Sequence, residues 1–403
     1  MQTPPSPSEY ISPALVRLLA VGAGAAVANS YYNQAFLGYL TADFALVAGA
    51  VSIVPVLTQA GNAFGVLLLA PLGDRMERRS LILMTIAALV IALVGAAVSP
   101  GFAWLALASL AVGLFATVAQ QIVPLAVHLA PPTGRGRVLG TVTGGILIGI
   151  LLARTVSGTI SDLWGWSFVF WFAAVLMIAI GVALAVWLPR VPPTTDMSYP
   201  RLIGSLWTLV RTHPVLRRAV TVQFLIFAAF MGFWSNLALL LAEPRFQLGG
   251  TEVGLLALVG VAGALAAPIA GGFADRRGEG LVVSAGAGLV VFAFMIFGFW
   301  QGSLAGLVVG ILVLDLAVQS SQVANQARVY ALDPNARSRL NTVFMACMLA
   351  GGAVGAGLGG AAYAISGWTG TCIFGATSAG LALVISRAPR LPGLDTRRTD
   401  PHP

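Results

Sequence analysis

Long apolar runs dominate the pattern of residues along this chain. Runs of twenty or more mostly apolar residues recur over nearly all of its 403 residues, separated by short polar segments. A run of that length crosses about 30 Å of hydrocarbon as an α-helix. The strands of a membrane barrel would instead alternate polar and apolar residues. The pattern predicts an all-α integral membrane protein with twelve transmembrane helices, near residues 15–40, 47–72, 81–99, 101–130, 139–162, 166–188, 218–242, 250–274, 280–300, 302–331, 338–364 and 368–388.

The only long polar stretch lies in the middle of the chain, between predicted spans 6 and 7. It contains a short amphipathic segment with Ile203, Leu206, Trp207 and Val210 on one face, which predicts a helix on the membrane surface. We therefore expect four parts, in chain order: an N-terminal six-helix bundle (1–188), a cytoplasmic linker with a short amphipathic helix (189–217), a C-terminal six-helix bundle (218–388) and a cytoplasmic tail (389–403).

The distribution of arginine predicts the orientation of the chain in the membrane. All 22 basic residues are arginine, and with the N-terminus inside nearly all of them fall in cytoplasmic loops, the linker or the tail. Arg245 alone falls in a loop on the opposite side. We expect a multi-pass protein of the bacterial cytoplasmic (inner) membrane with both termini cytoplasmic. The net charge of +8 then reflects topology and requires no nucleic-acid partner.

The two halves of the chain share short sequence matches at one offset. Gly73-Asp74-Arg75 and Ala274-Asp275-Arg276 lie 201 residues apart, and the same offset places Gln121 on Gln322. It also superposes residues 139–142 on 340–343. Such matches indicate an internal duplication that yields two pseudo-symmetric bundles. In transporters built from parallel repeats, the solute site lies between the halves near the middle of the bilayer.

The segment Ala70-Pro-Leu-Gly-Asp-Arg-Met-Glu-Arg-Arg79 resembles the loop signature of the major facilitator superfamily, G-x-x-x-D-R-x-G-R-R/K. Asp74, Arg75, Arg78 and Arg79 match it, whereas Ala70 and Glu77 stand where glycine is usual. A second copy at 271–280 matches at Asp275 and Arg276, without the final basic pair. Signatures of drug antiporters in spans 4 and 5 are not matched. Together with the twelve spans, the resemblance covers essentially the whole chain.

The resemblance implies a cytoplasmic gate. Asp74 would latch onto the start of span 11, near Arg337 and Arg339, and Asp275 would latch onto span 5. A carboxylate beside a helix N-terminus is stabilised by unpaired N–H groups and the helix dipole. The alternative is that both segments are ordinary positively charged cytoplasmic turns.

Among the ionisable residues inside predicted spans, three stand out: Arg154, Asp315 and Arg328. Such groups cost at least ~2.5 kcal/mol each by insertion scales, so they are candidates for function. Asp315 could carry the coupling proton, contact a cationic solute, or pair with Arg154 or Arg328 as a structural ion pair. Arg154 could neutralise Asp315 or bind an anionic solute. We take Asp315 and Arg154 as the candidates for proton coupling.

Polar residues at helical spacing predict a cavity. In span 10, Asp315, Gln319, Gln322 and Gln326 occupy one face, and the resemblance implies that spans 1, 4, 7 and 10 line a central cavity. Amides can also join helices within a membrane, and that alternative remains open. The candidates for solute binding are Asn29, Tyr32, Asn33, Gln120, Gln121, Gln223, Trp234, Asn236, Gln319, Gln322, Asn325 and Gln326.

These features favour a secondary active transporter that moves a small organic solute, a drug or a metabolite, by alternating access. Proton-coupled export is the leading hypothesis, and proton-coupled uptake is the alternative. An intramembrane enzyme is a remote alternative, because G-x-S-x-G, H-E-x-x-H and a phosphate-binding loop are absent from the sequence. A transport-dead sensor is equally remote, since the linker and tail are short. We expect no cofactor or metal, and a monomer whose partners are the solute, the proton and the lipid bilayer.

Overall fold

The structure is a computed structural model that describes residues 11–193, 197–265, 278–333 and 336–388. Within these ranges the secondary structure consists of helices. The first half comprises α1 (Pro13–Ala28), η2 (Tyr32–Ala35), α2 (Leu37–Asp43), α3 (Ala48–Val51), α4 (Ile53–Leu69), α5 (Leu72–Arg75), α6 (Arg78–Ala97), α7 (Phe102–Phe115), α8 (Val118–Leu129), η3 (Pro132–Gly134), α9 (Arg135–Trp164) and α10 (Trp166–Trp187).

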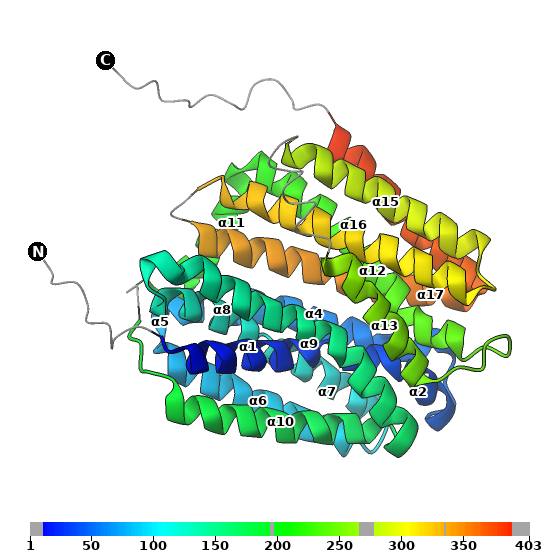
Figure 1. Ribbon diagram of the computed structural model, residues 1–403, viewed down its shortest axis with the longest axis horizontal. Helices are drawn as coiled ribbons and strands as arrows, with labels where there is room; N and C mark the ends of the chain where they lie inside the picture. The colour runs from blue at the N-terminus through cyan, green and yellow to red at the C-terminus, as the bar shows by residue number, and fades with distance from the viewer. Residues whose placement is uncertain (1–10, 194–196, 266–277, 334–335, 389–403) are drawn as a thin grey trace, which may run out of the picture.

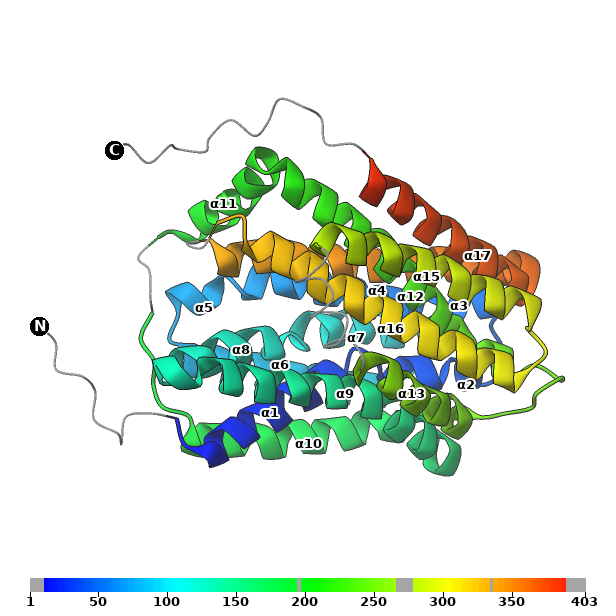
Figure 2. The same cartoon turned by 45° about the horizontal axis from the view of Figure 1, so that its top comes forward.

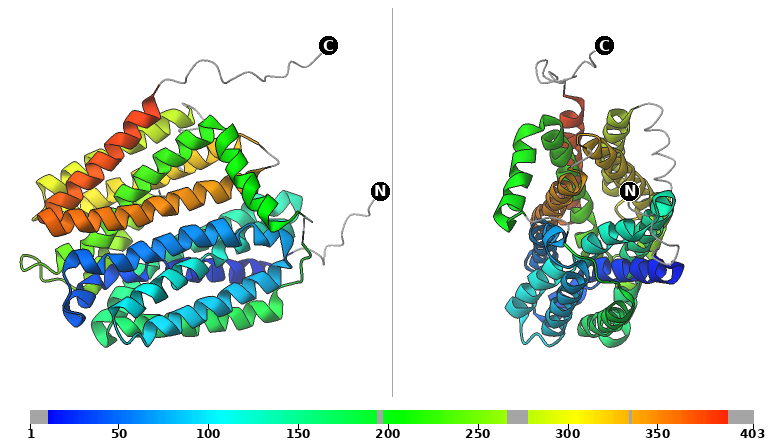
Figure 3. Two further views of the ribbon diagram at one scale, coloured as in Figure 1. Left: turned by 180° about the vertical axis from the view of Figure 1, so that it is seen from behind. Right: turned by 90° about the vertical axis from the view of Figure 1, so that its left-hand side faces the viewer.

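The second half follows the surface helix α11 (Tyr199–Thr212). It comprises α12 (Pro214–Leu241), α13 (Gly250–Leu265), α15 (Glu279–Phe299), α16 (Leu304–Tyr330) and α17 (Arg337–Arg387). In Figure 1 the helices run roughly across the view, with most of the first half below and the second half above. The end-on panel of Figure 3 shows the same division into two bundles.

The helices follow the order of the twelve predicted spans. Nine helices in the described part of the chain are long and apolar enough to cross a membrane, and α1 and α13 are shorter apolar helices. The last of the nine, α17, contains two spans, because Ser366 and Gly367 leave the helical conformation and Gly367 has φ +59°. Glycine adopts that angle without steric cost, so the chain turns there between spans 11 and 12.

Several predicted spans are divided into shorter helices, and the first and fourth are examples. In the first, α1 ends at Ala28, and a short 3-10 segment and α2 complete the crossing. The amide of Asn29 donates to the carbonyl oxygens of Ala25 (2.8 Å) and Ala26 (3.2 Å), which caps the end of α1. The fourth span divides into α7 and α8 in the same way. Local side-chain hydrogen bonds of this kind compete with continuation of the helix.

Small residues bring the helices of each half close together. A Cβ atom at Gly24 of α1 would lie 2.3 Å from the carbonyl oxygen of Gly145 on α9. In the second half, a Cβ at Gly355 of α17 would lie 2.1 Å from the carbonyl oxygen of Ala228 on α12. The glycines therefore allow backbone contact within each bundle, as in other membrane helix pairs.

The helix α11 lies at one end of the molecule, which we call the linker end. Its Leu202, Leu206 and Leu209 are buried, whereas Trp207 is exposed. Figure 2 shows α11 near one end of the bundles and the loop before α13 at the opposite, far end. The amphipathic helix thus buries one apolar face against the rest of the protein.

Candidate functional site

A cavity of about 320 Å³ lies between the two halves. Residues of α1, α4, α8 and α9 line it from the first half, and residues of α12, α16 and α17 line it from the second. Its polar lining consists of Tyr31, Asn62, Thr117, Gln120, Thr143, Arg154, Asp315, Gln319, Gln322, Gln326, Tyr330 and Asn341. A concave, mostly apolar site with a few convergent polar groups is typical of small-molecule binding.

Arg154 of α9 is held in place on the cavity wall by two neighbours. Its Nε donates a 2.7 Å hydrogen bond to Oε1 of Gln34, and its guanidinium carbon lies 4.1 Å from the ring centroid of Trp234. The side chain is 1% exposed, and Nη2 has no hydrogen-bond partner. Stacking on an aromatic face stabilises a cation. Arg154 therefore lines the cavity with one guanidinium nitrogen that has no protein acceptor.

Asp315 of α16 lines the same cavity from the second half. It is 3% exposed, and its Oδ2 has no hydrogen-bond partner. Its carboxylate lies against α13, where a Cβ atom at Gly260 would come within 3.0 Å of Asp315 Cγ. The charges of Arg154 and Asp315 interact across the cavity, yet no ion pair within 4.0 Å joins them. The alternative in which Asp315 forms a closed ion pair with Arg154 is therefore not what the structure has.

Aromatic rings from α12 form part of the apolar wall of the cavity. Phe227 and Phe230 line the cavity and stack on one another, with centroids 5.6 Å apart and an interplanar angle of 25°. Phe230 also contacts Trp234 edge-on at 6.3 Å. Such rings provide a surface for the hydrocarbon or aromatic part of a solute.

The predicted solute-binding residues divide into two groups. Gln120, Gln319, Gln322 and Gln326 line the cavity, and Trp234 lies directly behind Arg154. Helical spacing predicted the three glutamines of span 10, because they share one face with Asp315. Gln120 and Trp234 were candidates only as a polar and an aromatic residue of spans 4 and 7. Of them, Gln326 already donates to Tyr330 Oη (3.0 Å) and to Asn341 Oδ1 (2.9 Å).

The other candidates lie outside the residues that line the cavity and pack between helices instead. Asn33 donates to Thr58 Oγ1 (2.8 Å), and Gln121 donates to Thr85 Oγ1 (3.1 Å). Asn325 donates to the carbonyl oxygen of Ala219 (2.7 Å). Asn236 bonds to Gly232 and Thr371, Asn29 caps α1, and Tyr32 and Gln223 are buried. Most of these amides thus join helices within one half, as the alternative interpretation holds.

The two halves contact each other directly between the cavity and the far end. A Cβ atom at Gly158 of α9 would lie 2.0 Å from the carbonyl oxygen of Gly250 on α13. Thr155 donates from Oγ1 to the carbonyl oxygen of Gly254 at 2.9 Å. A second close contact lies between α17 and the start of α4, because a Cβ at Gly360 would lie 2.3 Å from the side-chain Oγ of Ser52, the residue before α4. The two halves are therefore closely packed along both helix pairs.

A carboxylate that the sequence analysis did not single out completes the contact at the far end. Asp162 of α9 accepts hydrogen bonds from the backbone N–H groups of Gly250 (3.0 Å) and Thr251 (2.7 Å), at the start of α13. It also accepts one from the hydroxyl of Tyr39 (2.5 Å). A residue of one half therefore caps a helix of the other half. The signal in the sequence was a lone acidic residue at the end of a span, and it is too common to be diagnostic.

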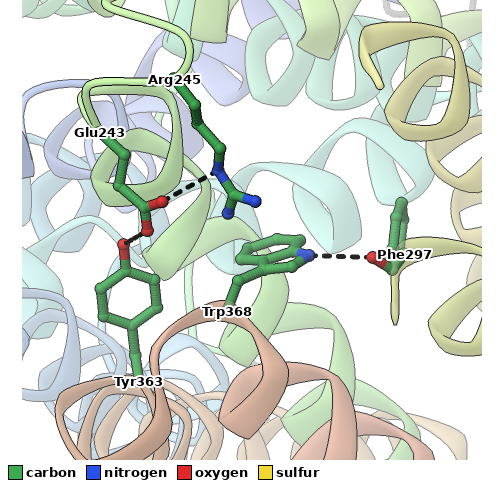
Figure 4. Close-up of polar contacts among 5 residues, drawn as sticks. All are labelled: Glu243, Arg245, Phe297, Tyr363 and Trp368. Atoms are coloured by element: carbon green, nitrogen blue, oxygen red, sulfur yellow. Dashed lines mark hydrogen bonds and ion pairs between the residues drawn. The ribbon is translucent and has the colours of Figure 1, made fainter. Parts of the chain in front are cut away.

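The loop before α13 is anchored within the second half. Glu243 accepts a 2.6 Å hydrogen bond from Tyr363 Oη and forms a 3.0 Å ion pair with Arg245 Nε (Figure 4). Figure 4 also shows Trp368, after the break in α17, donating through Nε1 to the carbonyl oxygen of Phe297 at 3.2 Å. The Tyr363 contact ties the loop to α17, and the Trp368 contact joins α17 to α15.

At the linker end, the first copy of the gate motif faces the start of α17. Asp74 lies 3.6 Å from Arg78 Nη2 and lines a small cavity together with Ser338, Asn341 and Thr342. Arg339 is close enough to interact with it electrostatically. Arg75 is exposed, and Arg79 donates to the carbonyl oxygen of Ala185 on α10. Asp275 and Arg276 of the second copy lie outside the described residues.

Glu77, which replaces the usual glycine of the motif, caps α6. Its carboxylate accepts from the backbone N–H groups of Arg79 (2.9 Å), Ser80 (2.8 Å) and Val191 (3.0 Å), and from the Ser80 hydroxyl. Burial alone would raise the pKa of Glu77, but these hydrogen bonds outweigh it and lower the pKa to about 2. Glu77 therefore ties the gate loop to the segment that follows α10.

Comparison with known proteins identifies the family to which this architecture belongs. The family model of the Major Facilitator Superfamily matches residues 18–329 and 245–401. The uncharacterized transporter YgaY of Escherichia coli O157:H7 is 40% identical over 380 residues, which cover 94% of this chain and 96% of that protein. The chloramphenicol efflux pump MT0201 of Mycobacterium tuberculosis is 26% identical over 285 residues, 68% of this chain and 62% of the pump.

A solved structure of the nucleoside transporter NupG has the same fold, with a TM-score of 0.74 at 15% identity over 92% of this chain and 97% of NupG. The predicted all-α membrane fold is thereby confirmed. The chain belongs to the Major Facilitator Superfamily of membrane transporters.

Proposed function

We propose that this chain is a secondary active transporter that exports a small organic solute by alternating access, with the proton as coupling ion. The observation that carries the proposal is the cavity between the halves, with Arg154 on one wall and Asp315 on the other. Each of these buried groups has an unpartnered polar atom. Buried charges without partners are costly, so their retention favours a role in binding or proton transfer.

The contacts between the halves support alternating access. Asp162 and the glycine contacts join the halves at the far end, whereas the cavity extends from Arg154 toward the linker end, where Tyr330 and Asn341 line it. This arrangement corresponds to the state that is closed at the far end. The opposite state would break the far-end contacts and tighten the contact of Asp74 with the start of α17, which is already present here.

The direction and setting of transport are part of the same proposal. The arginine pattern favours a cytoplasmic linker and cytoplasmic termini in the bacterial inner membrane, so the cavity would open inward in this state. The relative named a chloramphenicol efflux pump favours export of an organic compound. We also propose that the protein works as a monomer, because each chain supplies both walls of the cavity.

Reconstitution tests the proposal. Purified protein in proteoliposomes is screened by counterflow over a panel of drugs and metabolites, and accumulation is then driven by a pH gradient of either sign. The sign that drives accumulation separates export from uptake. In Asp315→Asn, we expect gradient-driven accumulation to be lost while counterflow exchange remains. Glu279→Gln, a carboxylate change at the start of α15 and outside the cavity lining, is the matched control. Unchanged gradient-driven accumulation in Asp315→Asn would refute proton coupling through this residue.

A further inference from the structure

The cavity holds one charge of each sign, and the two charges come from different halves of the protein. Arg154 belongs to α9 of the first half, and Asp315 belongs to α16 of the second. In a cavity surrounded by apolar side chains, opposite charges attract strongly, because the effective dielectric constant is far below that of water. Two such side chains within reach of one another are therefore expected to form an ion pair. In this structure the two side chains do not form one.

Each charge is held back by its own surroundings. The Nε of Arg154 is bound by Gln34, whose Nε2 in turn contacts Met231 Sδ at 3.3 Å, and the guanidinium stacks on Trp234. Asp315 rests against the α13 backbone at Gly260, a position where any larger residue would collide with the carboxylate. The separation is therefore built into the walls of the cavity. Arg154 Nη2 and Asp315 Oδ2 remain without partners on either side of it.

We propose that the transported solute is a small zwitterion. Its anionic group binds the free edge of Arg154, its ammonium group binds Asp315, and its apolar part lies on Phe227 and Phe230. A guanidinium matches a carboxylate in shape as well as charge, and an ammonium donates charge-assisted hydrogen bonds to a carboxylate. Such a solute satisfies both unpartnered atoms at once. A singly charged solute would leave one buried charge unsatisfied, at a substantial cost.

This inference rests on the proposed transport function and connects solute to coupling. Because the solute bridges the two halves, it is bound fully only when both walls are in place. Its ammonium group and the proton compete for Asp315. The protein would then bind either the solute from one side or the proton from the other, but not both at once, as export by exchange requires. The inferred class is that of amino acids and similar molecules, with the two charged groups a few bonds apart.

Matched probes test the class of solute. The twenty standard amino acids are first screened for binding to the purified full-length protein. For each one that binds, the free acid is compared with its carboxamide, which lacks the anionic group, and its des-amino acid, which lacks the ammonium group. With phenylalanine these are L-phenylalaninamide and 3-phenylpropionate. In the wild-type protein we expect either deletion to weaken binding about tenfold or more, as loss of a hydrogen bond to a charged group does.

Two variants assign the groups to residues. In Arg154→Gln the acid and its carboxamide should bind equally, within about twofold, because the anionic group has lost its partner. In Asp315→Asn the acid and its des-amino analogue should bind equally. A purely structural role would instead weaken all three probes by the same factor. Gln120→Ala, on the same cavity but uncharged, should preserve the ranking of the probes.

Several results would overturn the inference. These are no binding of any amino acid, equal binding of the three probes to wild-type protein, or uniform weakening in both variants. The wild-type comparison needs no variant, so a variant that fails to fold leaves the test intact. Counterflow separates this inference from the proposed function. Transport of uncharged or singly charged solutes without any zwitterion refutes the class of solute alone, whereas absence of transport refutes the function itself.

Discussion

Asp162→Ala should loosen the far end of the molecule without unfolding either half. The substitution removes the acceptor of two backbone N–H groups at the start of α13 and of the Tyr39 hydroxyl. All three lost hydrogen bonds lie at the far end. The two with α13 join the halves, because Asp162 belongs to α9 of the first half, whereas the one with Tyr39 lies within the first half. The state in which that end is open does not contain the bonds between the halves, so the substitution changes the balance between the states.

The size of the effect follows from the geometry. Replacement of a helix-capping residue costs about 0.5–2 kcal/mol. Asp162 is exposed, so solvent screens its charge, and we take about 1 kcal/mol. That energy corresponds to an approximately fivefold shift in the equilibrium toward the state with the far end open. Asp162→Asn keeps one acceptor oxygen and should give a smaller shift.

Distance measurements between spin labels can detect this shift. Labels attached at Leu163→Cys and Phe299→Cys, in a background of Cys347→Ala and Cys372→Ala, lie on exposed positions of the two halves near the far end. Double electron–electron resonance in nanodiscs gives the populations of short and long distances. We expect the long-distance fraction to rise in Asp162→Ala.

The matched control is Glu252→Gln. Glu252 accepts from the N–H of Gly249 at 2.8 Å, so it caps the same helix within a single half. It should change the local stability of α13 and leave the distance distribution as in wild type. If Asp162→Ala leaves the distribution unchanged, or if Glu252→Gln shifts it as much, the assignment of Asp162 as a contact that favours the closed far end is refuted.

Three further predictions concern other contacts. Gly158→Leu should disfavour the closed far end by about 1–3 kcal/mol, because its side chain would collide with the Gly250 carbonyl, and the same spin-label distances should lengthen. Gln34→Leu leaves Arg154 Nε without its acceptor. It should raise the Kd of the solute found by counterflow about tenfold, as measured by isothermal titration calorimetry. Glu77→Gln should lower the thermal unfolding temperature at pH 7. The pKa of Glu77 is about 2 in the folded protein and about 4.3 in the unfolded chain, so the stability that Glu77 adds over glutamine is fully present above about pH 4.3. It should vanish as the pH falls through about 2, which a scan of unfolding temperature against pH measures.

The candidate site could be predicted only in part. Helical spacing placed Asp315, Gln319, Gln322 and Gln326 on one face, and all four line the cavity. The spacing rule succeeds there because α16 is a regular helix over the whole stripe. It fails for span 1, where Asn29 and Asn33 lie at the break between α1 and α2 and no longer share the rotation of a continuous helix.

The membrane class and the order of the spans followed from the amino-acid sequence alone. Hydrophobic length is a local property, and a membrane span must satisfy its backbone hydrogen bonds within its own helix, so these features need no knowledge of neighbours. The motif around Asp74 could likewise be recognised from the sequence, because its residues are contiguous in the chain.

Only the tertiary structure decided which polar groups face the cavity and which join helices. The rotation of each helix about its axis is set by close packing, such as that of Gly24 on Gly145, and the sequence does not encode it locally. The same holds for the separation of Arg154 from Asp315, which depends on Gln34, Trp234 and Gly260 from three other helical elements. The capping of α13 by Asp162 joins residues 88 positions apart, and only the folded arrangement of the two halves brings them together.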